Sequence, residues 1–114
     1  MDSNLLPEIS YDDFAKLDIR IGMVIAAELV PDTDKLIKCI IDFGELGQRT
    51  IVSGIALWKK PEELVGKQLP YIVNLAPRVL RGVESQGMLL AASDESGVAL
   101  LSAERPLPPG TKLK

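Results

Sequence analysis

The chain has 114 residues, 46% of them hydrophobic and 25% charged, a balance typical of one globular domain. It has no histidine and one cysteine, Cys39, which excludes disulfide frameworks, zinc clusters and Ser–His or Cys–His catalytic pairs. The formal net charge is −3, yet residues 35–81 carry eight basic and four acidic side chains, and a basic middle can form a local positive surface because salt screens charges beyond about 10 Å.

The N-terminal part predicts a lead-in followed by one short helix. We expect residues 1–9 to be the lead-in and residues 10–114 to form the folded domain. Ser10 fits the N-cap of a helix over residues 10–17, with Asp13 in the place that completes a capping box. Phe14 and Leu17 are expected to face inward.

Most of the remaining chain alternates apolar and other residues with period two, which predicts β-strands. A glycine inside the first strand, Gly22, indicates a sharp bend of the kind that small closed barrels need. A second short helix is expected at residues 61–66, and residues 76–87 are expected to form a long loop. The expected strands cover residues 19–29, 35–43, 49–53, 69–75, 88–92 and 98–101.

Five or six short strands with a small helix between the third and the fourth predict an all-β domain. This order is typical of the OB-fold five-stranded barrel, here with a short N-terminal helix and extra C-terminal strands. A small β-sandwich would give a similar pattern, so periodicity alone leaves both architectures open.

The residues NLAPRVLRGVESQGM at 74–88 closely resemble the tRNA-binding domain family. This family includes free-standing tRNA-binding proteins and the C-terminal domain or small subunit of methionyl-tRNA synthetases. The resemblance runs from about residue 10 to 114. Other matching segments are DIRIG at 18–22, DKL at 34–36, VSGI at 52–55, PEELVG at 61–66 and PPGT at 108–111.

The resemblance implies an OB barrel, a homodimer and tRNA as the partner. Ala76 stands where the family often has a lysine, so we expect weaker RNA binding. Further RNA contacts are considered at Lys38, Trp58, Lys59 and Lys60. The family's RNA-contacting positions fall on Lys35, Asn74, Arg78, Arg81, Ser85 and Met88.

Each of these residues also has an ordinary structural interpretation. The lysines and arginines are either solvated surface or one basic patch, and Met88 is either core or a soft contact for a base or ribose. For Asn74 we favour a role in holding the loop. Gly87 is expected to adopt a backbone conformation that bulkier residues resist. Trp58 either stacks on RNA or packs at the dimer contact.

Aromatic residues make up only 4% of the chain, so stacking along an extended strand is not expected to dominate binding. Recognition of a folded RNA by shape and backbone, largely without sequence specificity, fits better. Acidic pairs such as Glu62-Glu63 point in different directions on a helix, so we assign no catalysis, cofactor, metal or small-molecule substrate.

We therefore expect a non-catalytic, dimeric tRNA-binding module that acts with or is attached to an aminoacyl-tRNA synthetase, with methionyl-tRNA synthetase as the candidate. The alternative is a chaperone-like or purely dimerising module of the same fold. No apolar run reaches the ~20 residues that cross a bilayer, and residues 1–4 lack a signal peptide's basic region. We expect a cytoplasmic protein without membrane contact, either an independent chain or a domain given its own start codon.

Overall fold

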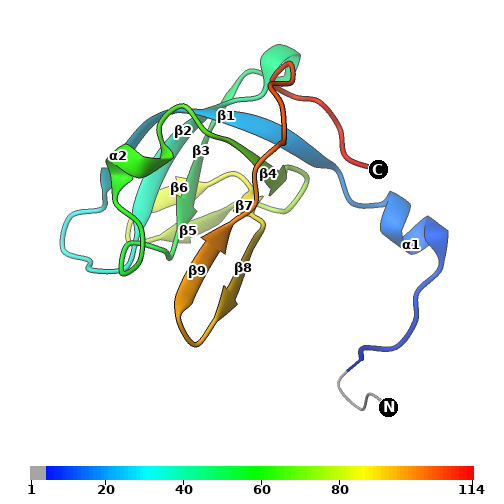
Figure 1. Ribbon diagram of the computed structural model, residues 1–114, viewed down its shortest axis with the longest axis horizontal. Helices are drawn as coiled ribbons and strands as arrows, with labels where there is room; N and C mark the ends of the chain where they lie inside the picture. The colour runs from blue at the N-terminus through cyan, green and yellow to red at the C-terminus, as the bar shows by residue number, and fades with distance from the viewer. Residues whose placement is uncertain (1–4) are drawn as a thin grey trace.

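The computed structural model describes residues 5–114, and the first four residues of the expected lead-in lie outside the described range. Most elements are strands, and the C-terminus lies on the same side of the molecule as helix α1 (Figure 1). In chain order the elements are α1 (Tyr11–Ala15), β1 (Ile19–Leu29), β2 (Ile37–Asp42), the 3-10 helix η1 (Gly44–Leu46), β3 (Gln48–Ser53), α2 (Pro61–Leu64), β4 (Gln68–Ile72), β5 (Arg78–Leu80), β6 (Val83–Ser85), β7 (Met88–Leu89), β8 (Ala91–Asp94) and β9 (Gly97–Leu100).

Five strands form one antiparallel sheet in the order β3-β2-β1-β4-β7. The sheet curls until β3 meets the segment that follows β6. There the Gln86 N–H donates to the Thr50 carbonyl at 2.8 Å, and the Val52 N–H donates to Ser85 Oγ at 3.0 Å. These bonds nearly close the sheet, which confirms the expected OB-type barrel over the sandwich.

The barrel interior is filled by side chains from several strands, and along β2 every second residue is buried. On β2 these are Ile37, Cys39 and Ile41, all at most 4% exposed. A Cβ at Gly22 would lie 2.4 Å from Ile41 Cγ2, so glycine allows β2 side chains to pack directly on the β1 backbone. The register of β1 against β2 shifts between Val24 and Ala26, two residues beyond the position where we expected the bend.

Two expectations for the second half of the chain are wrong in detail. The predicted loop contains the hairpin β5–β6, whose tip residues Arg81 and Gly82 both have positive φ, 51° and 82°. The expected strand at 88–92 is two strands, because β7 pairs with β4 whereas β8 pairs with β9. Strands of two or three residues are too short to produce a readable alternation.

Helix α1 begins after Ser10 and has the expected capping box, in which the Asp13 N–H donates to Ser10 Oγ at 3.1 Å. The expectation that Phe14 and Leu17 face inward is wrong, because they are 37% and 38% exposed. Helix α1 projects away from the barrel (Figure 1), and none of its residues is buried. We name residues 5–15 the arm.

The C-terminal residues 101–114, named the tail, return along β1. The Ile21 N–H donates to the Thr111 carbonyl at 2.9 Å, and the Gly110 N–H donates to the Ile21 carbonyl at 2.7 Å. Within residues 5–114, no helix is long and apolar enough to span a bilayer.

Candidate nucleic-acid interface

Two of the candidate cations share one hollow at an end of the barrel. Lys35 comes from the turn between β1 and β2, and Arg81 comes from the tip of the β5–β6 hairpin. Both side chains are exposed and line a hollow of about 710 Å³ together with Asp32 and Asp34. The hollow is therefore concave and lined by two basic and two acidic side chains.

A smaller hollow of about 50 Å³ is lined by Arg78, Ser85 and Met88, together with Leu80 from the same hairpin. Since Arg78 and Arg81 both belong to the β5–β6 hairpin, the two hollows lie against one structural unit. The structure thus brings five of the six sequence-predicted positions around this hairpin, which we name the basic hairpin (residues 78–85).

Met88 lies on the surface, with 43% of the residue exposed, although β7 pairs it with Ile72. Of the two interpretations that the sequence allowed, the structure excludes the core position. A thioether at the rim of the smaller hollow is soft and polarisable, which suits contact with a ribose or a base.

Ser85 is only 4% exposed, and its hydroxyl is already engaged within the chain. It accepts the Val52 N–H and lies 3.2 Å from the Gly87 carbonyl, to which it donates. The expected backbone conformation of Gly87 is confirmed: its φ is +151°, and a Cβ would lie 2.8 Å from the Ile72 carbonyl oxygen. In this structure Ser85 and Gly87 fasten the basic hairpin to the barrel.

Two residues that sequence reasoning missed hold the same junction. The Thr50 N–H donates to Gln86 Oε1 at 3.0 Å, so a side-chain amide takes the place of a backbone carbonyl. The Arg49 guanidinium donates to the Val73 carbonyl and, at 3.5 Å, to the Gln86 carbonyl. The sequence could have drawn attention to Arg49, because it is a cation near the start of a strand with buried residues. Nothing in the sequence singles out Gln86, a glutamine beside Ser85.

Asn74 lies two residues after β4, where the chain leaves towards the basic hairpin. Its amide bonds to a different segment, the connector 16–18 between the arm and β1. Asn74 Oδ1 accepts the Asp18 N–H at 2.8 Å, and Asn74 Nδ2 donates to the Lys16 carbonyl at 2.7 Å. Its holding role therefore concerns the connector and not the loop.

The additional candidates lie beside this end of the barrel. Lys38 forms an ion pair with Glu28 at 3.7 Å, which lowers its availability to a ligand. Lys59 and Lys60 line a separate hollow of about 540 Å³. Ala56 lines the same hollow, and the Ala56 N–H donates to the Lys35 carbonyl at 3.0 Å. Lys59 and Lys60 form a neighbouring site and not part of the two hollows at the basic hairpin.

Trp58 is 48% exposed, and one edge of its indole contacts the turn between β8 and β9. A Cβ at Gly97 would lie 2.4 Å from Trp58 Cδ1, so the ring packs tightly on that glycine. The ring anchors the β8–β9 hairpin and leaves part of its surface free.

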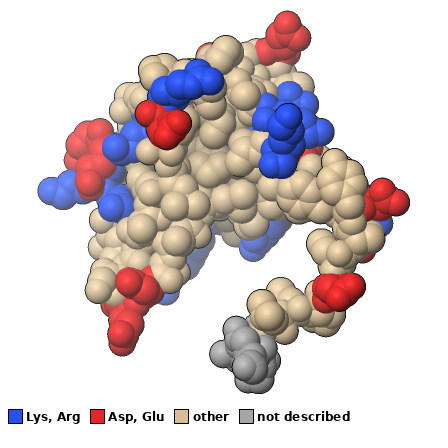
Figure 2. Space-filling model, turned by 45° about the vertical axis from the view of Figure 1, so that its right-hand side comes forward, with Lys and Arg blue, Asp and Glu red and all other residues tan. Residues whose placement is uncertain are grey.

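Charge is unevenly distributed over the surface. Figure 2 shows basic side chains in separate groups over the barrel, wide uncharged areas between them, and acidic side chains along the arm. The buried Cys39 is no reactive group, because desolvation raises the pKa of its thiol from 9.0 to about 11.

Comparison with known proteins agrees with this geometry. Residues 19–112 match the model of the family described as "Putative tRNA binding domain". A methionine–tRNA ligase of Methanocella arvoryzae is 52% identical over 109 residues, which cover 96% of this chain and 16% of that protein. The chain thus spans about one sixth of the length of the curated relatives it matches.

Two solved structures superpose over nearly the whole chain. A MetRS-related protein from Pyrococcus horikoshii has a TM-score of 0.90 at 44% identity, covering 96% of this chain and all of that one. The chaperone CsaA of Bacillus anthracis has a TM-score of 0.86 at 36% identity, covering 95% of this chain and all of that one.

Proposed function

The chain belongs to the tRNA-binding domain family, and from this premise we propose that it binds tRNA through the basic hairpin, by shape and backbone contacts and largely without sequence specificity. The observation that carries the proposal is the convergence of Lys35, Arg78 and Arg81 on the two hollows that flank this hairpin. Exposed cations around a concave surface meet phosphates and release counterions, which favours binding even though the chain is acidic overall.

The backbone that carries Arg81 is held in place at the turn and at the base of the hairpin. Its positive φ belongs to a two-residue turn, and the base of the hairpin is fixed by the Ser85 and Gln86 bonds to β3. The fixed backbone removes the cost of ordering the hairpin when Arg81 meets a phosphate, and only the freedom of its exposed side chain is lost.

The direct test is a charge reversal of Arg78→Glu with Arg81→Glu, measured by fluorescence anisotropy with labelled tRNA. We expect at least a hundredfold loss of affinity and a smaller salt dependence. With roughly four to six phosphate contacts per dimer, log affinity of the unaltered chain should fall with a slope of about −3 to −5 against log salt.

The matched control is Lys67→Glu with Lys114→Glu, which changes the net charge equally. These cations do not line either hollow at the basic hairpin. An equal loss of affinity in both variants would mean that only total charge matters, and a flat salt response would contradict phosphate binding altogether.

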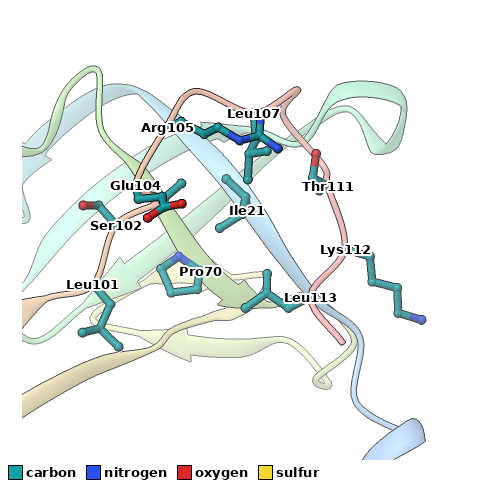
Figure 3. Close-up of a pocket in the computed structure, with 11 residues that line it drawn as sticks. Ile21, Pro70, Leu101, Ser102, Glu104, Arg105, Leu107, Thr111, Lys112 and Leu113 are labelled. Carbon is teal, nitrogen blue, oxygen red and sulfur yellow. The ribbon is translucent and has the colours of Figure 1, made fainter.

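We further propose that the protein acts as a homodimer in which the arm of each copy lies on the other. The arm exposes Leu5, Leu6, Ile9 and Tyr11, each at least 65% exposed, besides Phe14. Next to the connector lies a largely apolar groove of about 440 Å³, in which Ile21, Pro70 and Leu113 point towards one another while the Lys112 side chain extends away (Figure 3).

An apolar arm and an apolar groove on the same chain are self-complementary, which is what a twofold dimer requires. Sedimentation equilibrium over a wide concentration range tests this part. A mass of about twice 12.4 kDa is expected. A monomer at every concentration would exclude the dimer but leave tRNA binding through the basic hairpin intact.

As a biological role we propose a non-catalytic tRNA-holding module of the cytoplasm, made of the domain 10–114 and serving methionyl-tRNA synthetase either as part of the same chain or as a separate partner. The methionine–tRNA ligase relatives support this role. Tethering a second tRNA site to an enzyme raises local tRNA concentration and hence the apparent affinity.

The similarity to CsaA supports a second candidate, a chaperone-like module that binds unfolded polypeptide. The exposed apolar arm and groove are the surfaces that would serve it. A competition pull-down with immobilised tRNA and an unfolded polypeptide separates the two candidates. We expect retention on tRNA that Arg78→Glu with Arg81→Glu removes, and preferential retention on the polypeptide would favour the chaperone.

A further inference from the structure

The arm is joined to the barrel through very few bonds. Helix α1 has no buried residue and maintains its own N-terminus with the Ser10–Asp13 capping box. In the described part of the chain, three hydrogen bonds join residues 11–18 to the segment 73–74. The Val73 N–H donates to the Asp18 carbonyl at 2.9 Å, and the other two bonds are made by the Asn74 amide.

The two Asn74 bonds act on the groups that determine where the arm points. Lys16 is the C-cap of α1, and its carbonyl is one of the helix-end acceptors that have no partner within the helix. Asn74 Nδ2 satisfies this carbonyl, while Oδ1 holds the N–H of Asp18 at the entrance to β1. One planar side chain thus fixes both ends of the connector and, with them, the direction of the helix.

Resting on the dimer proposed above, we propose that Asn74 is a positioning residue for self-association: it orients the arm towards the second copy and does not itself contact tRNA. The neighbouring residues make this separation possible. Asn74 lies two residues after β4 and shortly before the segment that carries Arg78 and Arg81, yet both polar atoms of its amide bond to the connector.

The test compares two substitutions in the full chain. Asn74→Ala removes both bonds. Asn74→Asp has nearly the same shape and keeps the acceptor for the Asp18 N–H but replaces the donor that faces the Lys16 carbonyl. Self-association is measured by sedimentation equilibrium, tRNA affinity by anisotropy at concentrations where the variant is dimeric, and the Asp18 amide by hydrogen exchange.

We expect Asn74→Ala to weaken self-association at least tenfold, because each of the two copies then lacks two hydrogen bonds that order its connector before the arm meets the other copy. The Asp18 amide should exchange faster in Asn74→Ala and remain protected in Asn74→Asp, a difference that a general loss of stability would not produce. The tRNA affinity of the dimeric variant should stay within about threefold of the unaltered chain.

Arg78→Ala is the matched comparison, with tRNA affinity lost and self-association unchanged. The proposal is overturned if Asn74→Ala leaves the dimer constant unchanged, whether or not tRNA affinity falls. It is also overturned if the dimeric variant loses tRNA affinity tenfold, since Asn74 would then contact the RNA. A monomeric unaltered chain removes the dimer and this inference together, but not tRNA binding.

Discussion

The barrel and the segments around it are held by different kinds of interaction. Within the barrel, long strands pair through backbone bonds around a buried aliphatic core, in which Phe43 and Tyr71 meet edge to face with ring centroids 5.6 Å apart. The arm, the tail and the segment after β6 have little buried surface, and side-chain amides fasten each of them. The Gln68 amide bonds to both backbone groups of Leu107. The Asn74 amide bonds to the Asp18 N–H and the Lys16 carbonyl, and the Gln86 amide oxygen accepts the Thr50 N–H.

This difference implies that the barrel determines the stability of the chain, whereas the segments around it determine what the chain binds. An amide side chain offers the same donor and acceptor as a peptide group, so a single residue can extend the sheet by one pairing step. One such side chain is enough to position a segment, but it contributes far less to the free energy of unfolding than the burial of a strand does. Substitutions in the barrel should therefore unfold the protein, whereas substitutions in the fastenings should change what it binds.

The largest effect is expected from Phe43→Ala, because Phe43 is 1% exposed and packs on both Tyr71 and Gly22. Creating a cavity of this kind costs about 3–5 kcal/mol of the free energy of unfolding. Urea denaturation followed by Trp58 fluorescence measures it. Leu46→Ala, at a residue 42% exposed, is the control and should cost far less; comparable losses would contradict the barrel as the source of stability.

A second effect concerns alkaline pH. Burial raises the pKa of the Cys39 thiol from 9.0 to about 11, so the folded chain keeps a proton that the unfolded chain loses. This stabilisation is complete below about pH 9 and falls by about 2–3 kcal/mol as the pH rises to 11.

Denaturant titrations at pH 8 and pH 11 check this loss in the unaltered chain and in Cys39→Ala. The variant should lose less stability on going to pH 11. A remainder is expected because burial, with a smaller effect of the Cys39 charge, also raises the pKa of Tyr71. An identical loss in both chains would show that the thiol does not titrate in this way.

The closure of the barrel is tested by Ser85→Ala. This substitution leaves the buried Val52 N–H without its acceptor, which should lower the free energy of unfolding by about 1–3 kcal/mol. Thermal unfolding compared with Ser93→Ala, at an exposed position, provides the measurement. If Ser85→Ala were as stable as the control while losing tRNA affinity, Ser85 would act in binding and not in closure.

The smallest effect on unfolding is expected in the arm. Phe14→Ser changes a residue that the barrel does not bury, so the stability of the monomer should change by no more than about 0.5 kcal/mol. Self-association should fall strongly, which sedimentation equilibrium would detect. A large loss of monomer stability would place α1 against its own barrel and contradict the separation of the two regions.

The same division explains what could be predicted from the sequence. Period-two alternation in the sequence located β1, β2 and β3, although burial alternates residue by residue only along β2 and neighbouring residues are buried together in β1 and β3. It failed for β5 and β6, where three-residue strands are ordered by a turn and by single bonds. The helix signals over residues 10–17 led to the expectation that Phe14 and Leu17 face inward, because apolar residues on a helix do not reveal what covers them.

The candidate site was predicted more fully than its supports. Lys35, Arg78, Arg81 and Met88 were all identified through the motif and all reach the surface. Arg49 and Gln86 were not, because their roles depend on carbonyl and N–H groups brought from distant parts of the chain. Neither residue type nor spacing encodes such a partnership, and only the folded chain reveals it.

The path of the tail has a practical consequence. The Leu113 N–H donates to the Ile19 carbonyl at 2.8 Å, so the last residues of the domain lie beside its first strand. A domain whose entry and exit are adjacent can be fused to, or inserted into, another polypeptide without separating the insertion points. A circularly permuted barrel without the arm, with the tail joined by a short linker to the start of β1 and new ends opened at the turn between β8 and β9, should therefore retain its fold.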